Sequence, residues 1–179
     1  MERLNSGSLR LRRAREADLD ALCAILAVPA VAHGYFGAAT AAPEDLARRA
    51  LYSNFERERL GLAASWVACD DEGNPFGYVT VVEGYLAYFV KPALWGCGHA
   101  AAMAAAACAE VFRHASDAPL RACVFRENRV SVRVLEGLGF RFTGLHHPQI
   151  LGAHLPVPML TYALDAQTFH ASAGRAMEK

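Results

Sequence analysis

The chain has 179 residues, of which 54% are hydrophobic and 20% charged, and these values are typical of one soluble globular domain. A chain of this length buries enough surface to fold without disulfides or metals, which excludes a stapled miniprotein. Eighteen Lys and Arg residues balance eighteen Asp and Glu residues, so the zero formal net charge argues against nucleic acid or an anionic membrane as partner. We expect a single domain over residues 1–179, with its core over about 9–164.

Composition also bears on the cellular compartment. The five cysteines are widely spaced and form no C-x-x-C pair, which is typical of a reducing environment. The first residues lack the apolar stretch of a signal peptide, and the longest apolar run, Ala100–Ala109, is far shorter than the roughly 20 residues of a membrane span. The sequence therefore predicts a cytoplasmic protein. Alanine is unusually common, with 35 residues, and many of these lie between Ala100 and Ala122.

Apolar periodicity in the first third of the chain alternates between strand spacing and helix spacing. An apolar and basic alternation indicates a strand, and apolar residues three and four apart indicate helices. Prolines and acidic residues mark the helix ends. The predicted elements are, in order, a strand within 8–15, a helix from Leu19 that ends at Pro29, an aromatic loop over 33–37, and a helix from Pro43 to about Arg59.

The rest of the chain is predicted to complete one mixed domain. Turn-forming residues over 70–75 separate two β-rich stretches and indicate a hairpin. The expected elements are strands over 62–69, 76–82 and 85–90, an alanine-rich helix over 98–114, a strand over 120–124, a helix over 128–138, strands over 140–145 and 157–164, and a frayed tail over 171–179. This order predicts the α/β (α+β) class, with a mixed, mostly antiparallel sheet of six to seven strands and helices on both faces.

A glycine-containing turn joins the predicted strand that ends at Val90 to the alanine-rich helix. It reads Trp-Gly-Cys-Gly-His-Ala over Trp95–Ala100. Gly96 and Gly98 permit a tight turn and the close approach of a ligand. N–H groups at a helix start bind anions, for which a pyrophosphate is a natural guest. The pattern alone fits a plain turn equally well, and it lacks the Gly-Lys-Ser/Thr ending of a nucleotide P-loop.

A second motif follows further along the chain. It contains Asn-x-x-Ser at Asn128–Ser131 and Leu-Glu-x-Leu-Gly-Phe at Leu135–Phe140. Together with Trp-Gly-x-Gly-x-Ala at Trp95–Ala100, these stretches resemble the GCN5-related N-acetyltransferase (GNAT) superfamily, and within it the branch of ribosomal-protein N-terminal acetyltransferases. The resemblance covers roughly Leu9 to Leu164.

This resemblance implies an acetyl-CoA site without a metal. In the family, the strand that matches 85–90 splays away from its neighbour, pantetheine lies in the central cleft, and the following helix start holds the pyrophosphate. The residues implied to bind the cosubstrate are Phe89, Val90, Trp95, Gly96, Cys97, Gly98, His99, Ala100, Ala101, Asn128, Ser131 and Arg133. The alternative interpretation, which does not depend on the family, is that Asn128 only caps its helix and that Ser131 is a small packing residue.

The family also implies direct transfer of the acetyl group to an amine. The backbone N–H of Val90 is the implied donor to the oxyanion. Glu83 is the nearest carboxylate before the splayed strand and is the candidate base, although a plain turn role suits it as well. Many family members have a tyrosine acid where this chain has Leu135, so Ser131 is the candidate acid and Tyr88 a second option.

The resemblance places acceptor recognition near His33, Tyr35 and Phe36, although aromatic residues there also suit a core. The leading expectation is an acetyl-CoA-dependent N-acetyltransferase that acts on a primary amine, such as a protein N-terminus. A small-molecule amine acceptor and a catalytically degenerate acyl-CoA-binding module are the alternatives.

Two further expectations concern metals and assembly. His146, His147 and His154 lack regular ligand spacing and a carboxylate partner, so no metal site is expected. Edge strands near the C-terminus are compatible with a homodimer.

Overall fold

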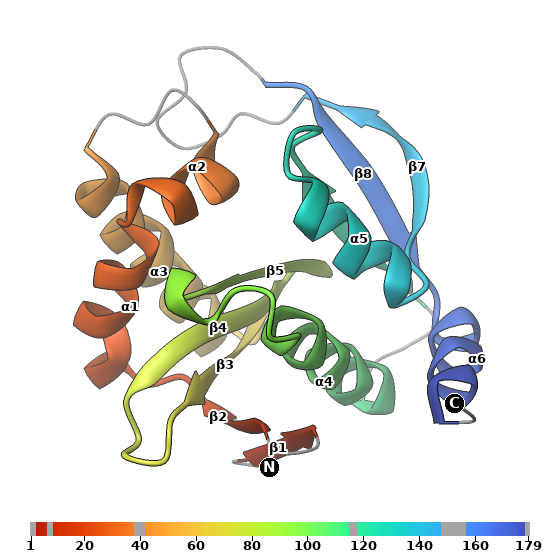
Figure 1. Cartoon of the computed structure of the whole chain (residues 1–179), viewed down its shortest axis with the longest axis horizontal. Helices are drawn as coiled ribbons and strands as arrows, with labels where there is room; N and C mark the ends of the chain where they lie inside the picture. The colour runs from red at the N-terminus through yellow and green to blue at the C-terminus, as the bar shows by residue number, and fades with distance from the viewer. Residues whose placement is uncertain (1–2, 7–8, 38–41, 115–117, 148–156, 178–179) are drawn as a thin grey trace.

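The core of the fold is a single twisted sheet. The computed structural model describes residues 3–6, 9–37, 42–114, 118–147 and 157–177. Within them, an eight-stranded sheet has the order β1-β2-β3-β4-β5-β6-β8-β7, and neighbouring strands are antiparallel except for β5 and β6, which are parallel (Figure 1). The strands are β1 (Arg3–Ser6), β2 (Leu9–Arg13), β3 (Ala63–Cys69), β4 (Pro75–Val82), β5 (Tyr85–Val90), β6 (Leu120–Val124), β7 (Arg141–His146) and β8 (Met159–Leu164). The predicted class is confirmed, and β1 is the strand that the sequence did not indicate.

Helices cover both faces of this sheet, as predicted (Figure 1). The helices are α1 (Leu19–Leu26), α2 (Pro29–Phe36), α3 (Pro43–Arg59), α4 (His99–His114), α5 (Arg129–Gly137) and α6 (Ala166–Met177), with short 3-10 turns at Glu16–Asp18 and Pro92–Leu94. One buried cluster joins α1, α2 and α3 to the face that carries Val67 and Phe89. The other joins α4, α5 and α6 to the face that carries Trp66 and Val90. Successive strand residues point to opposite faces, so Phe89 and Val90 belong to different cores.

Two segments differ from the sequence prediction. The aromatic loop expected over 33–37 is mostly helix, because Pro29 begins α2 at a position where its missing N–H costs no hydrogen bond. The tail expected to be frayed continues α6 as far as Met177, and Phe169 of that helix lies in the core. Among the described residues, no single helix is long and apolar enough to cross a membrane, although the bent pair Glu16–Leu26 and Pro29–Phe36 reaches that size and composition when taken together.

The alanine-rich helix α4 packs closely against β4. Its buried positions are Met103, Ala104, Ala107 and Cys108, and three of these four side chains are small. A Cβ placed on Gly77 of β4 would lie 2.8 Å from the Met103 sulfur. The alanines of the helix and the glycine of the strand therefore allow a close approach that fixes the start of α4 against the sheet.

The two neighbours of β5 are paired to it to very different extents. β4 pairs with β5 along its whole length, from Tyr85 to Val90. β6 pairs with β5 only at Tyr85, which lies opposite Arg121, where the Arg121 N–H donates to the Gly84 carbonyl at 2.8 Å. Beyond this point the two strands separate, so the predicted splayed strand is confirmed. We call the separation of β5 and β6 beyond Tyr85 the seam opening.

Candidate active site

The backbone of β5 presents polar groups to the seam opening. The Lys91 N–H donates to the Phe76 carbonyl at 2.8 Å, so Lys91 is bonded to the β4 side of the strand. Along an antiparallel strand, consecutive residues direct their N–H and C=O groups to alternate sides. The N–H and C=O groups of Tyr88 and Val90 therefore point away from β4, into the seam opening. This is the orientation that the expected role of the Val90 N–H requires.

The glycine loop continues from this strand end. The indole Nε1 of Trp95 donates to the Val90 carbonyl at 2.7 Å and ties the loop back to β5. Gly96 and Gly98 have φ values of +80° and +79°, and a Cβ at either position would meet no atom within 4 Å. The loop is therefore held in a left-handed conformation beside open space. α4 begins directly afterwards at His99, so its first N–H groups have no helical acceptor and suit a pyrophosphate.

Four further residues of this loop and of the helix start were predicted to bind the cosubstrate. His99 packs its ring against Phe76, with centroids 5.1 Å apart, and Ala100 and Ala101 follow in the first turn of α4. Cys97 is exposed between the two glycines. The loop residues thus lie together at the end of β5, as the motif indicated.

Asn128 has both a capping role and a bridging role. Its side-chain oxygen accepts from the Ser131 N–H at 3.1 Å and caps α5, which is the purely structural role that the sequence left open. Its Nδ2 also donates to the Gly34 carbonyl of α2 at 3.4 Å. Beside this bridge, the buried ring of Phe125 lies so close that a Cβ on Gly37 would be 3.0 Å from it. The start of α5 is therefore joined to the end of α2 across the sheet.

Ser131 meets Tyr88 above the seam opening. The Tyr88 and Ser131 hydroxyl oxygens are 2.8 Å apart, and the Tyr88 hydroxyl also lies 3.4 Å from the Ser131 carbonyl. Burial raises the pKa of Tyr88 to about 12, so its hydroxyl stays protonated at ordinary pH. Leu135 is buried in the core one turn further along α5. The sequence named both hydroxyls separately but gave no signal that they touch.

Glu83 is not brought together with these groups. It lies in the turn between β4 and β5, with its side chain 58% exposed and 3.7 Å from Arg57. Val90 is at the other end of β5, about 20 Å away at the usual rise of a strand. Glu83 therefore lies where β5 and β6 are still paired, and its expected role as base is not supported by its position.

The residues expected to read the acceptor lie on the α2 side of the sheet. Tyr35 stands edge-on to Phe89, with ring centroids 5.8 Å apart, while Phe36 is buried and His33 is exposed. Tyr35 and Phe89 therefore form a pair of packed aromatic rings near the end of β5. Phe36 belongs to the core, as the alternative interpretation had it.

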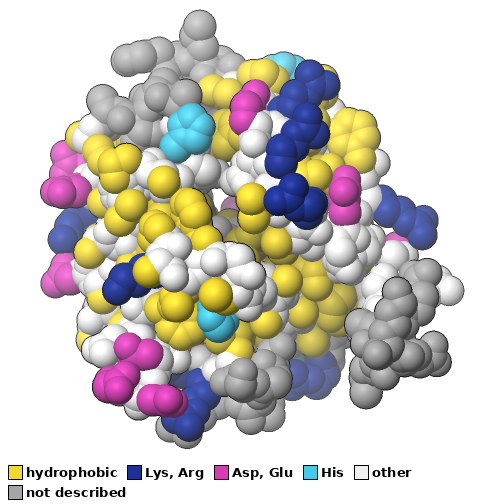
Figure 2. Space-filling view, viewed as in Figure 1, with side chains coloured by type: hydrophobic (Ala, Val, Ile, Leu, Met, Phe, Trp, Pro, Cys, Tyr) yellow, Lys and Arg dark blue, Asp and Glu magenta, His cyan; other side chains and the backbone are white. Residues whose placement is uncertain are grey.

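Positive charge gathers along the outer face of α5. Figure 2 shows a row of Lys and Arg side chains over this helix. Arg126, Arg129 and Arg133 are all exposed there. They contribute positive potential near the seam opening, but the described contacts give Arg133 no direct role in the loop.

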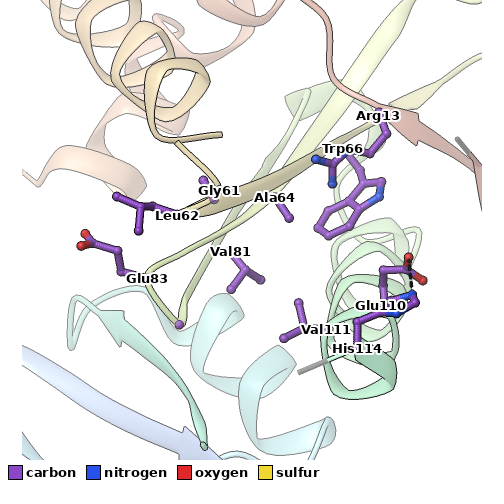
Figure 3. A pocket seen from close by; sticks show the side chains of 12 residues that line it. Arg13, Gly61, Leu62, Ala64, Trp66, Val81, Glu83, Glu110, Val111 and His114 are labelled. Carbon is purple, nitrogen blue, oxygen red and sulfur yellow. Dashed lines mark ion pairs between the residues drawn. The ribbon is translucent and has the colours of Figure 1, made fainter. Parts of the chain in front are cut away.

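One groove on the surface does not coincide with these groups. A groove of about 760 Å³ lies between the β3–β4 end of the sheet and the end of α4, and it is lined by Trp66, Glu83, Glu110 and His114 among others (Figure 3). It is at the opposite end of α4 from the glycine loop. Its charged groups are already paired, since Glu110 bonds to Arg113 and lies 3.4 Å from His114. We therefore locate the candidate site at the seam opening on chemical grounds.

Comparisons with known proteins identify the family of the chain. The model of the acetyltransferase (GNAT) domain matches residues 8–141. No curated protein matches the sequence significantly. Similar solved structures include RimJ of Mycobacterium smegmatis in complex with CoA-disulfide, with 22% identity and a TM-score of 0.74 over 97% of this chain and 92% of that chain.

Two other solved structures are similar to the same extent. The apo RimL ribosomal L7/L12 alpha-N-protein acetyltransferase has 16% identity and a TM-score of 0.71, over 92% of this chain and 94% of that chain. The Vibrio cholerae spermidine N-acetyltransferase with CoA and spermine has 17% identity and a TM-score of 0.72, over 90% of this chain and 98% of that chain. At these identities the structures show a shared fold. The family match includes the glycine loop and the Asn128–Ser131 motif, and the chain therefore belongs to the acetyltransferase (GNAT) family of N-acetyltransferases.

Proposed function

We propose that the protein transfers an acetyl group directly from acetyl-CoA to the α-amino group of a protein N-terminus. The observation that carries the proposal is the seam opening with the glycine loop at its end. The backbone groups of Tyr88 and the N–H of Val90 face the opening, where they suit the amide-rich pantetheine arm, while the Val90 carbonyl is bonded to Trp95. The start of α4 follows the glycine loop directly, and its free N–H groups suit a pyrophosphate.

Two groups of this chain are proposed to stabilise the transition state. Charge develops on the thioester oxygen when the amine attacks, and the Val90 N–H is the proposed donor to that oxygen. One such donor contributes on the order of 3 kcal/mol. The Ser131 hydroxyl is the proposed donor to the sulfur as the carbon–sulfur bond breaks. Asn128 holds Ser131 at the helix start through its bond to the Ser131 N–H.

The positions of the carboxylates favour one class of acceptor amine. Among the described residues of α2, β5 and β6, none is Asp or Glu, so no carboxylate base comes from these elements. An α-amino group has a pKa of about 8 and is partly unprotonated at neutral pH, whereas an alkylammonium group has a pKa of about 10. The absence of a carboxylate base from α2, β5 and β6 therefore favours an α-amino group over a lysine side chain or a polyamine, with water as the proposed acceptor of the proton.

A binding experiment tests the cosubstrate. Acetyl-CoA at about 100 times its dissociation constant should stabilise the fold by roughly 2.7 kcal/mol, which raises the melting temperature by about 5–10 °C for a chain of this size. Adenosine triphosphate at the same concentration is the control for a general phosphate effect. No shift with acetyl-CoA would contradict the proposal.

A transfer experiment tests the acceptor. Three acceptors are compared by mass spectrometry: a peptide with a free N-terminus and no lysine, the same peptide with a blocked N-terminus and one lysine, and spermidine. We expect acetylation of the first alone. Equal acetylation of spermidine would favour the small-molecule alternative. Binding of acetyl-CoA without transfer to any amine would favour a binding module.

A further inference from the structure

We infer that Tyr88 is a positioning residue: its hydroxyl donates to Ser131 Oγ and so directs the Ser131 hydrogen toward the departing sulfur of CoA. This inference rests on the proposed function and extends it to a residue outside the glycine loop and the Asn-x-x-Ser motif. It starts from the 2.8 Å separation of the two hydroxyl oxygens, one on β5 and one in the first turn of α5. The pair therefore joins β5, one border of the seam opening, to α5.

The direction of this hydrogen bond follows from chemistry and geometry. A phenol is much more acidic than an alkyl alcohol, so it is the better donor of the two. The Tyr88 hydroxyl also lies 3.4 Å from the Ser131 carbonyl, which can only accept. The Tyr88 hydroxyl has a single hydrogen, and we assign it to the nearer acceptor, Ser131 Oγ at 2.8 Å, with the carbonyl as a weaker second contact. Burial keeps Tyr88 protonated, since the pKa is raised to about 12, and this preserves its role as donor at working pH.

This hydrogen bond fixes the orientation of the Ser131 hydroxyl group. A serine hydroxyl has one hydrogen and two lone pairs, and its hydrogen otherwise turns to whichever acceptor is near. With Tyr88 donating to one lone pair, the Ser131 hydrogen cannot point at Tyr88. The backbone N–H of Ser131 donates to the side-chain oxygen of Asn128 at 3.1 Å, which fixes the first turn of α5. We assign the Ser131 hydrogen to the side of the seam opening.

The transfer step balances without a proton from Tyr88. The amine lone pair forms the new carbon–nitrogen bond, and the carbon–sulfur bond breaks with its electron pair on sulfur. The Ser131 O–H donates a hydrogen bond to this thiolate and keeps its proton. The amine proton passes to water, and CoA leaves as a thiolate, which is accessible because a thiol pKa is about 8.5. Tyr88 itself stays neutral throughout.

The test is Tyr88→Phe, which removes the hydroxyl and keeps the ring. We expect kcat to fall about tenfold, as for the loss of one hydrogen bond to a group that aids the transition state, with the KM for acetyl-CoA within about twofold. Ser131→Ala should lower kcat about a hundredfold. Because Tyr88 acts through Ser131, the double variant should be no slower than Ser131→Ala alone.

A matched control separates positioning from simple anchoring of α5. Tyr162 on β8 also bonds to α5, through its hydroxyl and Glu136 at 3.1 Å, but in the last turn of the helix. Tyr162→Phe should leave kcat within about twofold. An equal loss in Tyr162→Phe and Tyr88→Phe would overturn the inference, and so would a full further tenfold loss in the double variant.

Release of CoA thiol is measured with both amine and water as acceptor. Wild-type protein that releases no thiol with either acceptor contradicts the proposed function, whereas wild-type activity with an unchanged Tyr88→Phe variant contradicts only the role of Tyr88. Thermal unfolding with acetyl-CoA verifies that each variant is folded and binds. If Tyr88→Phe does not fold, Tyr88→Leu, compared with Ser131→Ala and the corresponding double variant, gives the same test.

Discussion

The two sides of β5 differ in a way that locates function. On the β4 side, the backbone groups of β5 are bonded to a neighbouring strand from Tyr85 to Val90. On the β6 side, pairing ends after Tyr85, and the groups of Tyr88 and Val90 face an opening. Buried backbone groups without partners are costly, so a fold retains such an opening only where another polar group or water takes the place of the missing strand.

The same contrast extends to the surrounding elements. The β4 side belongs to the continuous ladder of β1–β5, which α1–α3 and α4 cover on opposite faces. At the β6 side, side-chain bridges replace the ladder, namely Tyr88 to Ser131 and Asn128 to Gly34. The paired side provides rigidity, and the open side provides donors and acceptors for a ligand. A substitution on one side should therefore leave the properties of the other side nearly unchanged.

The largest expected effect is on the open side, from Gly98→Val. A β-branched residue at φ +79° is strained by about 1–2 kcal/mol and displaces the N–H groups at the start of α4. Loss of a charge-assisted bond or two to the pyrophosphate should weaken acetyl-CoA binding about a hundredfold. Isothermal titration calorimetry measures the change in affinity.

Gly73→Val is the matched control for backbone strain. Gly73 has φ +89° and also has open space around it, but it lies in the turn between β3 and β4. Both variants should lose similar stability, while only Gly98→Val loses affinity for acetyl-CoA. Equal losses of affinity would mean that the glycine loop has no special role in binding.

The next effect is on the paired side, from Asp18→Asn. Asp18 is 6% exposed and accepts from Arg12 at 2.7 and 2.8 Å and from the Arg15 N–H at 2.8 Å. Replacing this carboxylate should lower the free energy of unfolding by about 2 kcal/mol, because the Arg12 guanidinium loses its ionic partner. Acetyl-CoA affinity should stay unchanged. Asp20→Asn, in the exposed pair with Arg48, should cost under about 1 kcal/mol.

The Asp18 effect has a defined pH dependence. Burial alone would raise the pKa of Asp18. The hydrogen bonds from Arg12 and from the Arg15 N–H lower it by a larger amount, so the net pKa is below the ordinary value. The carboxylate therefore stabilises the fold above its unfolded pKa of about 3.9, and this contribution is lost as the pH falls through the lower folded value. Urea unfolding from pH 7 to pH 3 should show the advantage of wild type over Asp18→Asn shrinking below about pH 4. A constant difference would exclude the ion pair as its cause.

Local signals in the sequence were sufficient for most elements of the two sides, although not for β1. The glycine loop, the alanine-rich helix and the Asn128 cap each depend on residues close together in the chain. Pro29 was misleading because a proline after one helix also starts another, and its neighbours 33–37 therefore lie in α2. Tyr88 and Ser131 are 43 residues apart, and no spacing rule connects a strand residue to a helix residue at that separation. Their contact depends on how α5 packs over β5.

The position of Glu83 shows the same limit of local signals. Proximity in sequence to β5 suggested a base, but a strand has two ends, and Glu83 lies at the paired end. Its φ of +49° marks a turn residue, which is consistent with the structural alternative. The end of β5 at which the reaction is proposed depends on the direction in which β5 and β6 separate. That direction is set by the pairing of strands in the sheet and not by residues close together in the sequence.

The smallest expected effect therefore comes from Glu83→Gln. The substitution keeps the backbone strain and side-chain size and removes only the charge, which faces solvent beside Arg57. We expect kcat and the KM for acetyl-CoA to stay within about twofold, because a group about 20 Å from Val90 along β5 is outside hydrogen-bond reach of the acceptor amine. Glu56→Gln, in another exposed pair of α3, controls for general charge loss. A tenfold fall in kcat for Glu83→Gln alone would break the comparison of the two sides, since it would place the reacting amine at the paired end of β5.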